Sequence, residues 1–67
     1  MGIYQKALED LNEAIRLKSD YADAYINRAR VYLNQGDKLS GCRDAQKVCK
    51  LGNCKFLEDA KQRGVCR

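Results

Sequence analysis

The sequence of 67 residues contains no proline, no histidine and no tryptophan, and these absences narrow what the protein can be. Proline is the strongest helix breaker, and its absence together with apolar residues at helical spacing favours long helices over strands. Without histidine the chain lacks the commonest general base, and it also has no glycine-rich phosphate loop. We therefore expect neither enzyme activity nor a cofactor.

A long hydrophobic run is also missing. No stretch of about 18 apolar residues occurs, so no membrane span is expected, and no signal peptide is visible. The formal net charge of +4 arises largely in the C-terminal third, where Phe56 is the only aromatic residue. A nucleic-acid surface usually interleaves aromatic and basic side chains, so it is not indicated. The charge is either a solvated basic surface or a match for an acidic protein or peptide partner.

The length and periodicity predict a single all-α domain over residues 1–67. Apolar residues at three- and four-residue spacing predict four helices, at residues 3–18, 21–35, 38–51 and 55–64. Gly36 is expected to end the second helix in a left-handed conformation, with Asp37 as the next N-cap, and Ser19 and Asp20 are expected to cap the second helix. Short connections make successive helices antiparallel neighbours. The residues expected in the core are Leu11, Tyr25, Ala29, Tyr32, Ala45, Val48, Phe56 and Ala60.

An internal repeat organises the chain. Residues 7–17 return, degraded but in register, as residues 41–51, so that Asp10 recurs as Asp44 and Leu17 as Leu51. A fixed period of this length is typical of stacked helical hairpins. Such an array usually offers an extended surface rather than a catalytic pocket.

Residues 22–37 resemble the first helix and turn of a tetratricopeptide repeat. Tyr25 occupies the tryptophan position of the family pattern, Ala29 the glycine position and Tyr32 the tyrosine position, whereas Arg28 replaces the usual leucine. The Ala-x3-Phe positions of the pattern are filled by Ala7 and Leu11 in the preceding repeat and by Gly41 and Ala45 in the complete one. The proline of the pattern is replaced by Ser19 and Asn53. The resemblance implies an α-solenoid in which residues 3–18 form the second helix of a partial repeat, 21–51 one full repeat and 55–64 a capping helix. An unrelated four-helix stack is the alternative.

The same resemblance implies a protein–protein interaction module with a concave groove. The positions that match groove-facing residues of the family are Asp23, Ile26, Asn27, Arg30, Asn34 and Lys61. Asn27 and Lys61 also match two positions of the clamp that binds acidic chaperone tails, but Leu57 replaces the second lysine of that clamp. The alternative function is a capping or oligomerisation segment that closes a longer array without its own ligand.

Four cysteines lie between residues 42 and 66. Cys42 and Cys49 are separated along one helix by about 10.5 Å of axial rise, too far for two ligands of one zinc ion, so no metal site is expected. If the third helix turns back into the fourth, nested disulfides Cys49–Cys54 and Cys42–Cys66 are favoured, and bridges within one helix are excluded by distance. Four free, buried thiols are the alternative. Disulfides would place the protein in a periplasm or extracellular space, and free thiols in the cytoplasm.

Helix 3–18 carries an apolar stripe that includes Leu8, Leu11 and Ile15. Only one neighbouring helix follows it in the sequence, so part of the stripe is expected to stay exposed. Exposed apolar patches tend to find partners, and the sequence therefore predicts a homodimer through residues 3–18.

Overall fold

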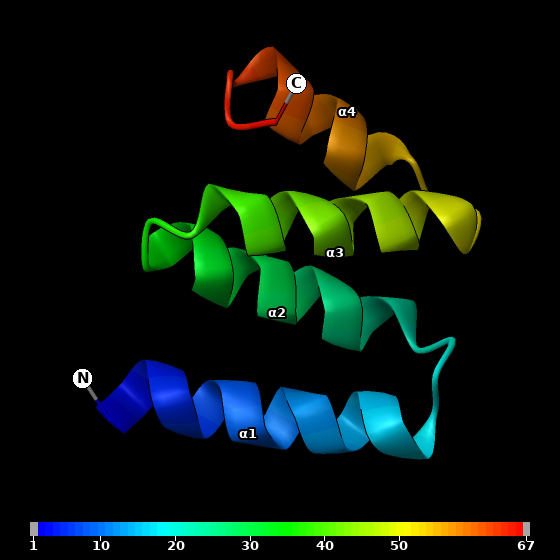
Figure 1. The fold of residues 1–67 in the computed structure, drawn as a ribbon. Coiled ribbons are helices and arrows are strands. Elements are labelled where there is room, and N and C mark those ends of the chain that lie inside the picture. The colour runs from blue at the N-terminus through cyan, green and yellow to red at the C-terminus, as the bar shows by residue number, and fades with distance from the viewer. Residues whose placement is uncertain (1, 67) are drawn as a thin grey trace.

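The computed structural model describes residues 2–66 and contains α-helices without strands in that range (Figure 1). The helices are α1 (Gly2–Leu17), α2 (Ala22–Asn34), α3 (Lys38–Lys50) and α4 (Lys55–Gln62). Successive helices run antiparallel and stack in chain order, with α1 at one end of the stack and α4 at the other (Figure 1). The molecule measures 29 × 26 × 13 Å, so it is a slab about one helix thick. The predicted all-α, hairpin-stacked fold class is confirmed.

The turns show which local signals determine the helix ends. Gly36, with a φ of 84°, ends the turn after α2, and the Asp37 carboxylate accepts a hydrogen bond from the Ser40 amide at 3.2 Å. Both predictions at this turn are confirmed. The predicted cap at Ser19 and Asp20 is wrong, because Tyr21 occupies the N-cap of α2 and makes no side-chain cap. The Tyr25 hydroxyl instead holds this turn by donating to the Ser19 carbonyl at 3.1 Å.

The core lies along both faces of α3, where it meets α2 and α4. Tyr25, Ala29, Ala45, Val48 and Ala60 are buried as expected. The other members of the buried set are Ala24, Gly41, Asp44, Leu57 and Cys66.

Three residues that were predicted to be buried are only half-buried, namely Leu11, Tyr32 and Phe56. Leu11 lies on α1, which packs mainly on α2, and no residue of α1 is buried. Tyr32 and Phe56 lie where a slab one helix thick leaves part of a large ring uncovered. The thinness of the slab therefore limits how much aromatic surface each helix can bury.

Close approach of α2 and α3 depends on Gly41. A Cβ atom at this position would lie 2.6 Å from Leu33 Cδ2 and 3.3 Å from the Ala29 carbonyl oxygen. The distance of 2.6 Å to Leu33 Cδ2 is shorter than an ordinary van der Waals contact. The glycine therefore lets the two helix backbones meet, and it fixes the position of Leu33.

Candidate functional site

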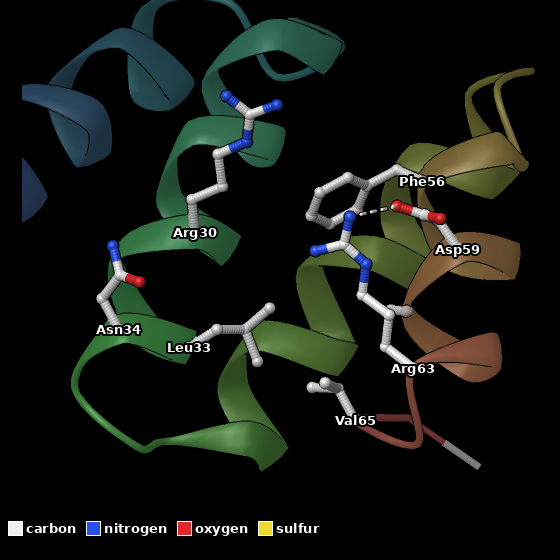
Figure 2. A pocket seen from close by; sticks show the side chains of 8 residues that line it. Arg30, Leu33, Asn34, Phe56, Asp59, Arg63 and Val65 are labelled. Atoms are coloured by element: carbon white, nitrogen blue, oxygen red, sulfur yellow. Dashed lines mark ion pairs between the residues drawn. The ribbon is translucent and has the colours of Figure 1, made fainter.

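Two adjoining hollows lie between α2 and α4, and Figure 2 shows the residues that line the larger one. The larger has a volume of about 360 Å³ and the smaller about 290 Å³. Arg30, Phe56 and Asp59 line both, so the two hollows form one continuous groove. The remaining lining residues are Leu33, Asn34, Ala60, Arg63 and Val65 in the larger hollow and Ile26, Asn53 and Lys55 in the smaller.

Helical periodicity explains why these side chains face one another. Ile26, Arg30 and Asn34 follow each other at four-residue spacing along α2, which places them on one face of that helix. Phe56, Asp59 and Arg63 follow the same rule on α4 and its last turn. Figure 2 shows Arg30 and Asn34 on one side of the groove and Phe56, Asp59 and Arg63 on the other, with Val65 on the segment after α4.

The groove combines apolar surface with excess positive charge. Leu33, Phe56, Ala60 and Val65 supply the apolar part. Arg63 pairs with Asp59 at 3.4 Å, and because both side chains are exposed the pair is weak. Arg30 makes no ion pair within residues 2–66. With Lys55 also in the lining, three cationic side chains outnumber one carboxylate.

Of the six groove-facing positions that the family resemblance implied, three line the groove and three do not. Ile26, Arg30 and Asn34 line the groove. Asp23, Asn27 and Lys61 are exposed and line neither hollow. Leu57, the residue at the second lysine position of the chaperone-tail clamp, is buried among core residues of α3 and α4.

Most of the α4 wall was absent from the sequence prediction, which named only Lys61 there. Phe56, Asp59 and Arg63 carry the wall instead. Their spacing of three and four residues was a visible signal of a shared face. The sequence did not show which face of α4 turns toward α2.

A polar network fixes α2, the other wall of the groove. Arg28 donates two hydrogen bonds to the Asp44 carboxylate, at 2.8 Å from Nε and 2.7 Å from Nη2, and a third to Asn12 Oδ1 at 2.9 Å. These hydrogen bonds to Asp44 raise the pKa of Arg28 above its ordinary value. The guanidinium carbon also lies 5.4 Å from the centroid of the Tyr25 ring. One side chain thus joins α2 to both α1 and α3.

Two disulfides connect α3 to residues on either side of α4. Cys42 pairs with Cys66, with their Cα atoms 5.7 Å apart, and Cys49 pairs with Cys54 across the α3–α4 turn. This is the nested arrangement that the hairpin geometry favours. No cysteine in the described part of the chain is free.

Across residues 2–66, no cluster of His, Cys, Asp and Glu side chains is suited to hold a metal ion. In the same range no helix is both long enough and apolar enough to cross a membrane.

Comparison with known proteins adds one match. A family model described as "TPR repeat" matches residues 1–36, a range that covers α1, α2 and the turn at Gly36. No curated protein and no solved structure matches the chain.

Proposed function

The chain belongs to the tetratricopeptide repeat family, whose repeats are protein-interaction modules, and we propose that its groove between α2 and α4 binds an extended acidic peptide of a partner protein. The observation that carries this proposal is the continuity of the two hollows through Arg30, Phe56 and Asp59. A continuous groove suits several consecutive residues of an extended chain better than one compact small molecule.

The chemistry of the lining supports an acidic peptide with apolar residues. Arg30 is free of ion pairs in the described range, so it can receive a carboxylate without first losing an internal partner. Phe56, Leu33 and Val65 offer contact area for an apolar side chain. Alternate side chains of an extended peptide point in opposite directions, so one set can contact the apolar surface while carboxylates approach the rim. The net charge of +4 attracts such a peptide over longer range.

The groove supports binding rather than catalysis. Its lining pairs no serine, cysteine or lysine nucleophile with a general base, and its one carboxylate, Asp59, is paired with Arg63. We infer that the module acts by holding its partner in place.

Peptide binding can be tested by fluorescence anisotropy with a labelled short peptide of alternating glutamate and valine. We expect saturable binding to the oxidised protein, and none for the same peptide with lysine in place of glutamate. Arg30→Glu should weaken binding by at least about tenfold, because it reverses a charge in both hollows. Arg43→Glu is the matched control, since Arg43 is exposed on α3 and lines neither hollow. Equal effects of the two substitutions would contradict a specific groove.

The chaperone-tail clamp forms a separate arm of this test. Asn27→Ala and Lys61→Ala should leave binding of the peptide nearly unchanged, because neither residue lines the groove. A strong loss with these two variants, together with a need for a free peptide C-terminus, would favour the clamp instead. No binding by any acidic peptide would favour the capping or oligomerisation segment.

The disulfides also bear on where the protein works. Two bridges form between the four cysteines of the chain. Stable disulfides are rare in reducing compartments, so we propose that the protein works in an oxidising one, such as a periplasm or the extracellular space. Alkylation of free thiols in freshly lysed cells, followed by mass spectrometry, measures the fraction that is bridged.

A further inference from the structure

The α4 wall of the groove is attached to the rest of the molecule mainly through α3. Helix α4 packs on α3, and the two disulfides join α3 to the residues that flank α4, Cys54 before it and Cys66 after it. This wall contributes Phe56, Asp59 and Arg63 to the groove, with Val65 just beyond it. Whatever loosens α4 therefore removes one whole side of the groove.

The noncovalent attachment of α4 is thin. The buried cluster at this contact consists of Ala45, Leu57, Ala60 and Cys66, so leucine is its only large buried side chain. Phe56 and Val65 pack against the cluster but are only half-buried. Alanine buries little apolar area, and hydrophobic stabilisation scales with that area. The helix has 8 residues, fewer than the roughly 12–15 that an isolated helix needs to persist in water. Its position thus depends strongly on the covalent bridges.

We propose that the groove is a redox-controlled binding site, in which reduction of Cys42–Cys66 by a dithiol releases α4 from α3 and abolishes peptide binding. This inference rests on the proposed peptide-binding function of the same groove.

The chemistry is thiol–disulfide exchange. A thiolate of the dithiol attacks one cysteine sulfur, the S–S bond breaks, and the other cysteine leaves as a thiolate that takes up a proton. The second thiol of the reagent then displaces the first protein sulfur and closes the reagent's own disulfide. Two electrons pass from the dithiol to the protein for each bridge, and the two protein sulfurs end as thiols.

The two bridges differ in their effect. Cys42–Cys66 spans a sequence separation of 24 and Cys49–Cys54 one of 5. A cross-link that closes a longer loop restricts the unfolded chain more. We therefore expect loss of Cys42–Cys66 to raise the fraction of molecules with α4 undocked by about a hundredfold. Cys66 is only 4% exposed, whereas Cys42, Cys49 and Cys54 are half-buried, so a reagent gains access to the Cys66 sulfur more slowly than to the other three.

Hydrogen exchange followed by mass spectrometry, on the full chain with and without dithiothreitol, measures α4 docking independently of any ligand. We expect amides of residues 55–65 to exchange about a hundredfold faster after reduction. Amides of α2 should keep most of their protection, because the Arg28–Asp44 pair holds that helix. The labelled glutamate–valine peptide should lose binding in the same samples.

Variants separate the two bridges. The double variant Cys42→Ala with Cys66→Ala should show fast exchange in α4 and no peptide binding even without reductant. The double variant Cys49→Ala with Cys54→Ala should keep peptide binding, and dithiothreitol should still abolish that binding by reducing Cys42–Cys66. A variant lacking all four cysteines should show no response to dithiothreitol, which controls for direct effects of the reagent. Retained α2 protection in each variant shows that the rest of the chain is folded.

Specific outcomes overturn the proposal. A mass gain of four hydrogens, one pair for each bridge, with unchanged exchange at residues 55–65 would show that α4 does not need the disulfides. Undiminished peptide binding with α4 undocked would show that the wall is dispensable. Failure of the oxidised protein to bind the peptide, with the exchange response intact, would instead overturn the groove function and support redox control of α4 docking.

Discussion

Arg28 and Asp44 form a bidentate ion pair that joins α2 to α3 across 16 positions of sequence. Asp44 is 4% exposed, and the described residues contain no buried side-chain nitrogen or oxygen atom without a hydrogen-bond partner. Arg28 stands where the tetratricopeptide pattern has leucine. A polar pair therefore occupies this position between α2 and α3, and Asn12 extends it to α1.

Removing one partner of this pair should be costly. Arg28→Ala leaves the buried Asp44 carboxylate without its partner, and we expect a loss of about 3 kcal/mol in the free energy of unfolding. The double variant Arg28→Leu with Asp44→Ala removes both charges and should lie within about 1 kcal/mol of the parent protein. Urea unfolding followed by circular dichroism measures both. Equal losses in the single and double variants would show that apolar groups cannot take the place of the pair.

Filling the space at Gly41 should force α2 and α3 apart. Gly41→Val places a Cβ against Leu33, and we expect a destabilisation of about 2 kcal/mol, typical of an overpacked core. Because Leu33 lines the groove, peptide binding should weaken as well. Gly2→Val is the control, since a Cβ at Gly2 meets no atom within 4 Å. A neutral Gly41→Val variant would mean that Leu33 moves aside at little cost.

The turn between α1 and α2 should depend on the Tyr25 hydroxyl. Tyr25→Phe keeps the buried ring and removes the bond to the Ser19 carbonyl, so we expect a loss of about 1 kcal/mol. Tyr4→Phe alters an exposed ring on α1 and should leave the thermal midpoint unchanged. A midpoint of Tyr25→Phe equal to that of the parent would mean that water replaces the hydroxyl without loss.

Self-association through α1 is the prediction that the sequence made for residues 3–18. The predicted stripe is less exposed than expected, because Leu8, Leu11 and Ile15 are half-buried. The exposed apolar side chains of α1 are instead Ile3, at 80%, and Leu17, at 72%, which lie two heptads apart and so share another side of the helix. We expect sedimentation at rising concentration to show a dimer. Ile3→Lys with Leu17→Lys should shift it to monomer.

Leu39→Lys is the matched control for the dimer, because Leu39 is an exposed leucine on α3 rather than α1. It should leave the dimer intact. A parent protein that remains monomeric at about millimolar concentration would contradict association through this face.

The sequence predicted the ends of the helices to within about two residues, because the signals that determine them are local. Helical periodicity, the glycine stop at Gly36 and the cap at Asp37 act over a few neighbouring residues, so they can be read without knowing the fold. The cysteine pairing followed from the same local knowledge once the third helix was assumed to turn back into the fourth.

The groove was predictable on one wall and not on the other. The family pattern supplied Ile26, Arg30 and Asn34 on α2, since that helix matches the pattern closely. Helix α4 carries no such pattern, and its rotation depends on packing against Ala45 and on the bridge from Cys66. Phe56 and Arg63 could be assigned to the groove only after that packing was known.

Asp10 and Asp44 occupy the same position of the 34-residue repeat, and they show where local information ends. The sequence by itself determined that both residues lie on helices, because that depends on neighbours within a turn or two. Only the tertiary structure decided that Asp44 is buried and paired with Arg28 while Asp10 is exposed. The physical reason is that α3 has a helix on each side, whereas α1 lies at the end of the stack and packs mainly on α2, and burial is set by neighbours that are distant in sequence.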